Sequence, residues 1–394
     1  MAKHDLSSLD PMAFAKMIPV REGVIAQSEP LKKETHPANI LAERLHPAVQ
    51  HLKVSAVREN TGSAKTYTLV PDCEMGTEAL SYFDAGQYLS LDFCINNIHT
   101  TRPYSIASSP REALQGFYEM TVKAVEGGTV SNHILESWKE GTRVTASAPM
   151  GFFTYEPLRD SDSVVAVCGG SGITPILSLA RAVCDGTEEL SLTVLYGAKR
   201  KDEILHKTLL DNLSKKCDNI KVVYILSEEE LEGFETGYIS ESLIRKYAPK
   251  KEYSLFMCGP EGMYCYLEEQ IPLLGIRRKH VRREICSSAS IPACVGSAPS
   301  SVTVRVKQNG ETTVVTAKRG DTLLSAIEKG GISAPSRCRG GECGFCRARL
   351  LSGEVYIPED TDRRRLADSM YGYIHPCCTY PLTDIELEIS NVKI

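Results

Sequence analysis

The chain has 394 residues and a mass of 43.3 kDa, which is too long for one compact core and indicates two or three domains. Its 45 Lys and Arg residues against 50 Asp and Glu residues give a net charge of −5, so nothing attracts it globally to nucleic acid or an anionic membrane. No run approaches the roughly 18 apolar residues of a spanning helix, and no signal peptide is recognisable. We therefore expect a cytoplasmic protein without stable membrane insertion.

Residues 1–50 form an N-terminal extension of mixed composition, with five prolines and one short helical pattern, PANILAERLHP. Such a terminus is usually tethered to the next domain, and a docking arm for a partner protein is the alternative.

Residues 51–158 contain short β-rich runs separated by turn residues and interrupted by one helical run at 129–138. This pattern predicts a small antiparallel barrel. Residues 159–285 alternate apolar strands such as VVAVC and LSLTVLY with helical stretches, which predicts a doubly wound domain around a parallel sheet.

Residues 286–301, CSSASIPACVGSAPSS, have the small polar composition of a linker, which would span roughly 50 Å when extended at about 3.3 Å per residue. Residues 302–394 form the last domain. It begins with two alternating runs around Asn309-Gly310, a strong hairpin signal. A helical run, a cysteine-rich loop and another alternating strand follow.

Fourteen cysteines in a chain without an export signal argue for ligands or reactive thiols rather than disulfides. In CRGGECGFC they follow the spacing C-x4-C-x2-C, and a fourth thiol comes from CC at 377–378. This is the plant-type [2Fe-2S] ligand pattern. The glycines let the loop wrap a cluster closely. Zinc would normally take two close Cys or His pairs, and a thioredoxin-like pair would lie at a βα junction, so both alternatives fit less well.

The arginines at 337, 339 and 347 either offset the negative charge of a cluster or form solvated surface. On the cysteine motif, the segment 301–394 resembles the β-grasp ferredoxins. In that family the last ligand stands four residues before a proline, as Cys377 stands before Pro381. The resemblance therefore implies that Cys378 is a neighbour and that the cluster ligands are Cys338, Cys343, Cys346 and Cys377.

RPYSIASSP, at 102–110, ends a predicted barrel strand with side chains suited to a flavin. Arg102 can bind a phosphate, Tyr104 can cover the isoalloxazine, and Ser105 can hydrogen-bond flavin N5. Downstream, GGTVSNHI begins a helix whose free amides favour phosphate. Taken singly, each motif is equally a turn or a helix cap. The candidate flavin-binding residues are Arg102, Pro103, Tyr104, Ser105, Gly127, Gly128, Thr129, Val130 and Ser131.

Together the two motifs resemble the ferredoxin–NADP⁺ reductase superfamily, whose flavin domain carries an Arg-x-Tyr-Ser signature and a Gly-Gly-x-x-Ser phosphate loop. The resemblance covers about residues 53–284. It implies FAD, because relatives with both motifs usually hold the dinucleotide, although a branch with the same domain order uses FMN.

CGGSGITP, at 168–175, joins a strand to a helix, where its glycines can offer amides to a pyrophosphate. MCGPEGMY ends a later strand. The resemblance implies that Cys258 lies near nicotinamide C4 and flavin N5, whereas base rates alone favour a buried structural thiol. It also puts Glu284 near the flavin, although Cys286 stands where relatives have an aromatic residue. The candidate nucleotide-binding residues are Gly169, Gly170, Gly172, Ile173, Thr174, Glu228, Cys258, Gly259 and Pro260; Ser105, Cys258 and Glu284 are the candidate catalytic residues.

NADP-specific relatives tend to have a Ser-Arg pair after the third strand of this domain. Here Ser227 is followed by three glutamates, and a carboxylate such as Glu228 would repel a 2′-phosphate and accept hydrogen bonds from ribose hydroxyls. NADH is therefore favoured. The basic stretch 199–201 instead favours NADPH, because it could supply positive charge to a 2′-phosphate.

These signals predict electron transfer from NADH through FAD and a [2Fe-2S] cluster. A hydride carries two electrons and the cluster takes one at a time, so a flavin is needed between them. The resemblance implies a protein acceptor, either an oxygenase or a corrinoid or other redox protein. The alternative is a redox-sensing or interaction protein with an Fe–S switch and a non-catalytic nucleotide fold.

Overall fold

The computed structural model describes residues 11–27, 36–284, 299–359 and 361–389. The chain divides into two units, Met1–Leu45 and His46–Ile394. The first unit contains helices α1 (Pro11–Gln27) and α2 (Pro37–Leu45). Helix α2 confirms the predicted helical pattern. Helix α1 was not predicted, because Pro19 stands inside it and disfavours a helix there.

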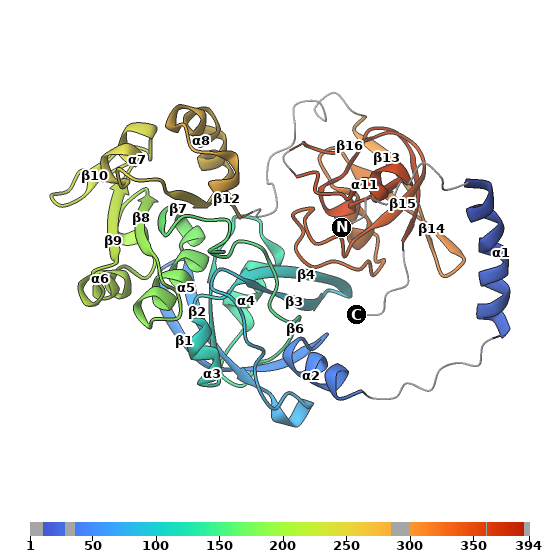
Figure 1. Ribbon diagram of the computed structural model, residues 1–394, viewed down its shortest axis with the longest axis horizontal. Helices are drawn as coiled ribbons and strands as arrows, with labels where there is room; N and C mark the ends of the chain where they lie inside the picture. Colours follow the sequence, from blue (N-terminus) through green and yellow to red (C-terminus); the bar gives the residue numbers. More distant parts are fainter. Residues whose placement is uncertain (1–10, 28–35, 285–298, 360, 390–394) are drawn as a thin grey trace, which may run out of the picture. The chain divides into compact units, whose positions relative to one another are not determined.

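An antiparallel sheet with the strand order β4-β3-β6-β1-β2-β5 forms the first domain of the second unit (Figure 1). A bridge between Ile106 and Met120 links the end of β4 to β5, so the sheet curls towards a barrel, as predicted. Leucine, tyrosine and phenylalanine side chains fill its core. The strands are β1 (Gln50–Thr61), β2 (Ala64–Pro71), β3 (Tyr88–Ile95), β4 (Ile98–Ser105), β5 (Tyr118–Lys123) and β6 (Arg143–Ala146).

Two helices and a short 3-10 turn, η2 (Cys73–Met75), accompany this sheet. Helix α4 (Thr129–Ser137) confirms the predicted helical run. Helix α3 (Pro110–Leu114) was not predicted, although the sequence carries its signal. Ser109 and Glu112 form a capping box, in which each side chain accepts a hydrogen bond from the backbone amide of the other residue.

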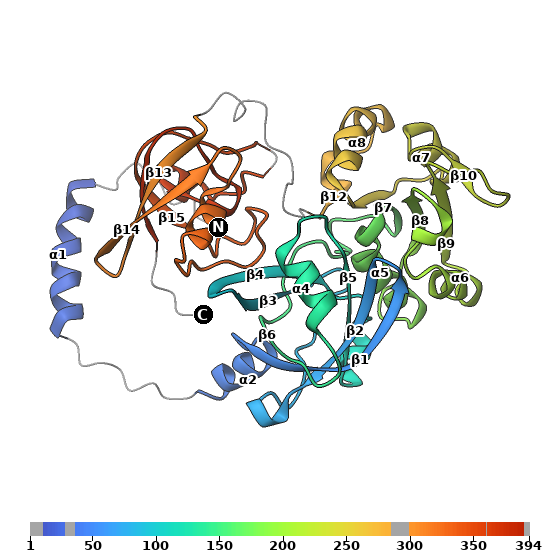
Figure 2. The same ribbon diagram turned by 180° about the vertical axis from the view of Figure 1, so that it is seen from behind.

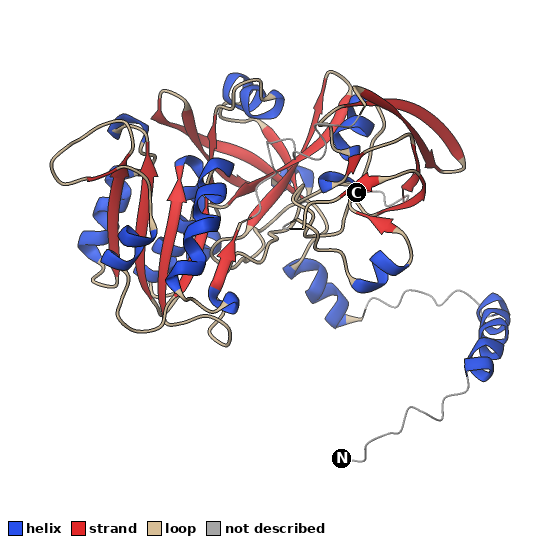
Figure 3. Cartoon of the chain, turned by 90° about the horizontal axis from the view of Figure 1, so that it is seen from above, coloured by secondary structure: helices blue, strands red, loops and turns tan. Residues whose placement is uncertain are grey.

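A parallel sheet with the strand order β10-β9-β8-β7-β11-β12 forms the second domain (Figure 3). Helices α5 (Ile173–Cys184) and α6 (Lys207–Lys216) cover one face, while α7 (Glu241–Tyr247) and α8 (Glu261–Leu274) cover the other, which confirms the doubly wound prediction. The strands are β7 (Ser163–Gly169), β8 (Ser191–Ala198), β9 (Ile220–Leu226), β10 (Glu235–Thr236), β11 (Ser254–Cys258) and β12 (Val281–Arg283); the 3-10 turns are η3 (Gly170–Gly172), η4 (Lys201–Glu203) and η5 (Arg278–His280).

A five-stranded sheet with the order β14-β13-β19-β15-β17 packs on helix α10 (Leu323–Lys329) in the last domain (Figure 2). Asn309 and Gly310 both have positive φ, so the predicted hairpin turn is confirmed. The other elements are β13 (Ser301–Gln308), β14 (Glu311–Lys318), β15 (Ala348–Ser352), β16 (Val355–Tyr356), α11 (Leu366–Met370), β17 (Tyr373–Ile374), η6 (Pro376–Cys378), β18 (Tyr380–Pro381) and β19 (Ile385–Ile389).

Most of the predicted linker, 286–301, and the unusual Cys286 lie outside the described residues, and β13 begins at the linker's last residue. Within the part of the chain that the structure describes, none of the helices has both the length and the apolar character that a membrane crossing requires.

Candidate active site

The candidate flavin-binding side chains lie at the end of β4. Arg102 is partly buried, and its Nη1 donates hydrogen bonds to Thr100 Oγ1 at 2.6 Å and to the Thr101 carbonyl at 2.7 Å. Burial, and then the nearby Arg339, lower its pKa to about 10. The guanidinium therefore still carries a full charge at neutral pH, as a phosphate ligand requires. Tyr104 packs against the barrel core from the same strand.

The first turn of α4 offers backbone amides at the second flavin motif. Gly128 is the N-cap and supplies no side-chain cap. A Cβ at this position would lie 2.6 Å from Ser131 Oγ, so the close approach of the loop to the helix needs glycine. With the positive end of the helix dipole, these amides fit a phosphate group. Arg102 and the α4 turn thus have the chemistry that the expected flavin dinucleotide needs.

The glycine loop after β7 touches the end of β11. These neighbouring strands stand where the strand order reverses, which is the usual ligand crevice of an open parallel sheet. A Cβ on Gly172 would lie 2.0 Å from the Cys258 carbonyl oxygen, and one on Gly169 would lie 3.0 Å from Pro260 Cδ. Two motifs about 90 residues apart in the sequence therefore form one surface, with the buried Cys258 at its base.

Two residues beside the glycine loop were missed in the sequence. Tyr196, near the end of β8, donates from its hydroxyl to the Gly170 carbonyl at 2.9 Å and accepts from the Leu205 amide at 3.1 Å. Lys123, at the end of β5, lies 3.8 Å from the position of a Cβ on Gly170. Both lie at or near the end of a strand, which is the only local signal that could have suggested them.

The two candidate carboxylates occupy different surroundings. Glu284 follows β12; its amide donates to the Met257 carbonyl at 3.0 Å, and its carbonyl accepts from Tyr264 at 2.7 Å. Glu228 is exposed after β9 and pairs with Lys199 at 3.2 Å. Glu228 therefore neutralises part of the positive charge of residues 199–201, the stretch that would favour a 2′-phosphate.

The four candidate cluster thiols form one connected group. The Cys338 thiol is within hydrogen-bonding reach of those of Cys343 and Cys377, and Cys377 also reaches Cys346 and its neighbour Cys378. Backbone amides point at the sulfurs: the Gly341 amide donates to Cys377 Sγ at 3.2 Å and the Cys343 amide to Cys338 Sγ at 3.3 Å. Thiols held among amides in this way fit an anionic iron–sulfur cluster.

The second thiol of the CC pair has a different orientation. Cys378 Sγ faces the carbonyl oxygens of Thr361 and His375, at 3.8 and 3.4 Å. Among the described residues, no three or more His, Cys, Asp or Glu side chains are arranged to hold a single metal ion. That finding concerns a mononuclear site, whereas the four thiols of a two-iron cluster are divided between two irons.

The loop arginines are not all solvated surface. Arg339 makes a bidentate ion pair with Glu328 of α10, at 2.7 and 2.9 Å, and these side chains are only 10% and 6% exposed. Arg337 is also buried. Arg347 is half exposed and pairs with Asp368 at 3.0 Å. The sequence could not distinguish these cases, because the partners of Arg337 lie far away in the chain and the pairing of Arg339 with Glu328 depends on how the loop folds against α10.

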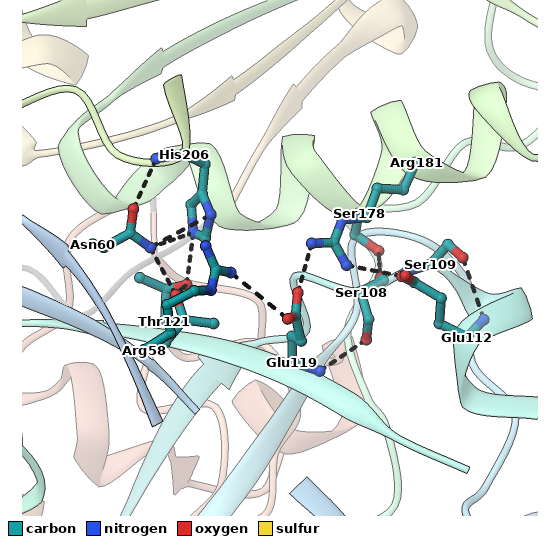
Figure 4. Close-up of polar contacts among 11 residues, drawn as sticks. Arg58, Asn60, Ser108, Ser109, Glu112, Glu119, Thr121, Ser178, Arg181 and His206 are labelled. Atoms are coloured by element: carbon teal, nitrogen blue, oxygen red, sulfur yellow. Dashed lines mark hydrogen bonds and ion pairs between the residues drawn. The ribbon is translucent and has the colours of Figure 1, made fainter. Parts of the chain in front are cut away.

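A polar interface joins the barrel to the parallel-sheet domain (Figure 4). On one side, Arg181 of α5 pairs with Glu112 at 2.9 Å and with Glu119 of β5 at 2.5 Å. On the other side, Nε2 of the buried His206 is hydrogen-bonded to Thr121 Oγ1 of β5 at 2.8 Å. The His206 amide donates to Asn60 Oδ1 of β1 at 2.9 Å. This interface joins strands β1 and β5 of the barrel to helix α5 and to His206, the N-cap of α6.

Three family models match the second unit in succession. Residues 58–155 match the oxidoreductase FAD-binding domain, 166–269 the oxidoreductase NAD-binding domain, and 306–382 the 2Fe-2S iron-sulfur cluster binding domain. Each match lies inside one of the three domains expected from the sequence.

Curated relatives align with this chain over most of both lengths. The chain is 26% identical over 355 residues to the glycine betaine monooxygenase reductase subunit of Pseudomonas aeruginosa, covering 84% of this chain and 93% of the relative. It is 29% identical over 345 residues to the 3-ketosteroid-9-alpha-monooxygenase ferredoxin reductase component of Rhodococcus rhodochrous, covering 84% and 94%.

Solved structures share the fold. Phthalate dioxygenase reductase, described as a modular structure for electron transfer from pyridine nucleotides to [2Fe-2S], matches with a TM-score of 0.61 and 21% identity over 87% of this chain and 98% of that one. The FAD/NAD-binding domain of nitric oxide dioxygenase from Vibrio cholerae matches with a TM-score of 0.53 and 21% identity over 60% and 97%.

The orientation of the two adjacent thiols gives a test of the fourth ligand. Cys377→Ser should abolish or cripple the cluster, because the Cys377 thiol reaches those of Cys338 and Cys346. Cys378→Ser should retain it. Iron and inorganic sulfide contents of anaerobically purified protein, with the visible absorption, measure the outcome. A cluster kept by C377S and lost by C378S would reverse the assignment.

His206 gives a pH test of the domain interface. Burial first, and then Arg58 and Arg181, lower its pKa from 6.5 to about 3. The unfolded chain therefore binds more protons than the folded chain between pH 6.5 and 3, so stability falls as the pH drops through this window, by at most about 1.4 kcal/mol per pH unit.

We expect the free energy of unfolding in urea to fall between pH 7 and pH 5, and to fall less steeply in His206→Gln. The exposed His46 provides the control, because His46→Gln should keep the wild-type slope. Equal slopes in wild type and H206Q would contradict a buried neutral histidine.

Proposed function

We propose, on the premise that this chain belongs to the flavin-dependent ferredoxin reductases with a C-terminal 2Fe-2S domain, that it transfers electrons from NADH through FAD and a [2Fe-2S] cluster to a separate protein. The observation that carries this proposal is the succession of three matched domains on one chain. When bound, the flavin accepts an electron pair and releases electrons singly, which a cluster requires. The chain's own residues bind and orient these groups.

In this proposal the β4 and α4 residues hold FAD. Arg102 and the amides from Gly128 to Ser131 bind its phosphates, and Ser105 hydrogen-bonds the reactive edge of the ring. The buried position of Cys258 supports a role as the small side chain that leaves the nicotinamide room to approach. Glu284, whose backbone is bonded to Met257 and Tyr264, is proposed to position a group or a proton near the flavin.

The glycine loop is proposed to bind the pyrophosphate of NADH, and Glu228 its adenosine ribose. The ion pair between Glu228 and Lys199 supports NADH over NADPH, because a lysine already engaged by a carboxylate has less charge to offer a 2′-phosphate. Since this pair is exposed, its contribution is modest.

The acceptor is proposed to be an oxygenase component. Support comes from the curated relatives, which are named as reductase subunits of monooxygenases. We also infer a cytoplasmic location, because a [2Fe-2S] site and 14 cysteines suit a reducing compartment.

Anaerobic titration of the purified protein with NADH tests the proposal. We expect stoichiometric bleaching of both the flavin and the cluster absorption, and a higher kcat/KM for NADH than for NADPH. Flavin that stays oxidised with either nucleotide would refute the reductase function, and a ratio in favour of NADPH would refute only the nucleotide assignment.

A further inference from the structure

Strand β4 is an edge of the flavin sheet, and the 2Fe-2S domain covers it. Helix α10 packs beside β4. Thr101 Oγ1 and Ser336 Oγ are hydrogen-bonded at 2.8 Å, with both residues buried. On the neighbouring strand β3, Ser90 donates to the Arg337 carbonyl at 3.4 Å. An edge strand normally needs protection from pairing with other chains, and here another domain of the same chain provides it.

The Thr100 hydroxyl connects the two domains. A hydroxyl has one hydrogen to donate and two lone pairs to accept. Thr100 donates to Glu328 Oε1 at 3.1 Å, and accepts from Arg102 Nη1 at 2.6 Å and from Arg339 Nη1 at 3.4 Å. One oxygen atom therefore joins the candidate flavin arginine to the buried ion pair beside the cluster loop.

Arg337 adds a further contact of the cluster loop with the flavin domain. Its guanidinium stacks on Phe345 at 4.2 Å within the cluster loop. Its Nη2 donates to the Ala48 carbonyl at 3.3 Å, and its Nη1 lies 3.7 Å from Met150 Sδ. The residue directly before the first candidate ligand, Cys338, is thus held against the flavin domain.

The cluster loop also lies near the flavin end of the hairpin. Tyr88 of β3 is the cross-strand partner of Ser105, and its ring lies against Gly151, where a Cβ would be 3.0 Å from it. Ser90, two residues further along β3, contacts the Arg337 carbonyl of the cluster loop. The loop therefore meets β3 close to the cross-strand partner of the candidate flavin serine.

Strand β4 sets the distance between the contact with the 2Fe-2S domain and the candidate flavin residue. Thr101 contacts the 2Fe-2S domain and Ser105 is the candidate flavin residue four positions later, so the two are separated by roughly 13 Å at about 3.3 Å per residue. The rate of electron transfer falls steeply with distance. A docked domain on this strand keeps the distance short and constant.

We propose that Thr100 and Thr101 are positioning residues that hold the 2Fe-2S domain on β4, at the separation that electron transfer between flavin and cluster requires. This inference rests on the proposed function and adds to it the side chains that join the two redox domains. Neither threonine contacts the reacting atoms.

The test uses the full-length holoprotein with the double variant Thr100→Val, Thr101→Val, which keeps side-chain shape and removes both hydroxyls. Thr100→Ser retains the hydrogen bonds. Thr312→Val, at an exposed position of β14, is the matched control. Two quantities are measured: hydrogen–deuterium exchange of the β4 and α10 peptides without NADH, and the separate rates of flavin and cluster reduction after anaerobic mixing with NADH.

In the double variant we expect at least tenfold faster exchange in both peptides and at least tenfold slower cluster reduction. Because Thr100 also accepts a hydrogen bond from Arg102, the rate of flavin reduction by NADH is compared in Ser336→Ala, where it should change less than twofold. Thr100→Ser and Thr312→Val should behave as wild type. Ser336→Ala removes the hydrogen bond to Thr101 from the side of the other domain and does not disturb Arg102. It should also raise the exchange, and should slow cluster reduction but not flavin reduction.

Wild-type exchange and wild-type cluster reduction in the double variant and in Ser336→Ala would overturn the positioning role. If NADH fails to reduce the flavin of the wild-type protein, the proposed function fails instead, and the exchange measurement still decides whether the threonines dock the domain.

Discussion

The partly buried hydrogen bonds of Thr100 join the β3–β4 hairpin to the iron–sulfur domain. Side chains on a strand alternate between its faces, so Thr100, Arg102 and Tyr104 share one face while Thr101 and Ser105 share the other. Each face of β4 therefore carries one contact with the iron–sulfur domain and at least one candidate flavin residue. The Glu328–Arg339 pair stands beside it with little access to water. Removing one partner of such a pair typically costs about 3–5 kcal/mol, because the other charge stays buried.

The interface between the barrel and the nucleotide domain also consists of ion pairs and hydrogen bonds, and these orient the two domains. Arg181 is shared by two carboxylates, and His206 is kept neutral by burial. Next to His206, the Leu205 amide bonds to Tyr196, whose hydroxyl holds the Gly170 carbonyl. A hydrogen-bonded route thus runs from the barrel to the glycine loop. Polar contacts of this kind are directional, so they fix the orientation of domains better than apolar contacts do.

The features that the sequence predicted correctly are local ones. Alternation and apolar runs gave the strands, and Asn309-Gly310 gave a turn whose positive φ angles the structure confirms. Cysteine spacing and glycine-rich strand ends were enough to expect the three domains and their cofactors. Gly172 illustrates the limit, because the sequence showed a glycine but not that the Cys258 backbone lies against it.

What the sequence could not show depends on long-range contacts. Thr100 reads as an ordinary strand residue, since its partners Glu328 and Arg339 lie more than 200 positions away. Arg337 looks like a surface residue for the same reason, since it donates to the carbonyl of Ala48. Helix α1 was missed because of its internal proline, whereas the capping box of α3 was a local signal that went unused.

The covered edge of the flavin sheet also bears on how such a protein is assembled from modules. A shortened chain that ended before Ser301 would keep the flavin and nucleotide domains but would leave Thr100 and Thr101 without Glu328, Arg339 and Ser336 as partners. Edge strands are in general the sites at which sheets pair with other chains. The iron–sulfur domain therefore also changes what the edge of its neighbour's sheet presents to other molecules.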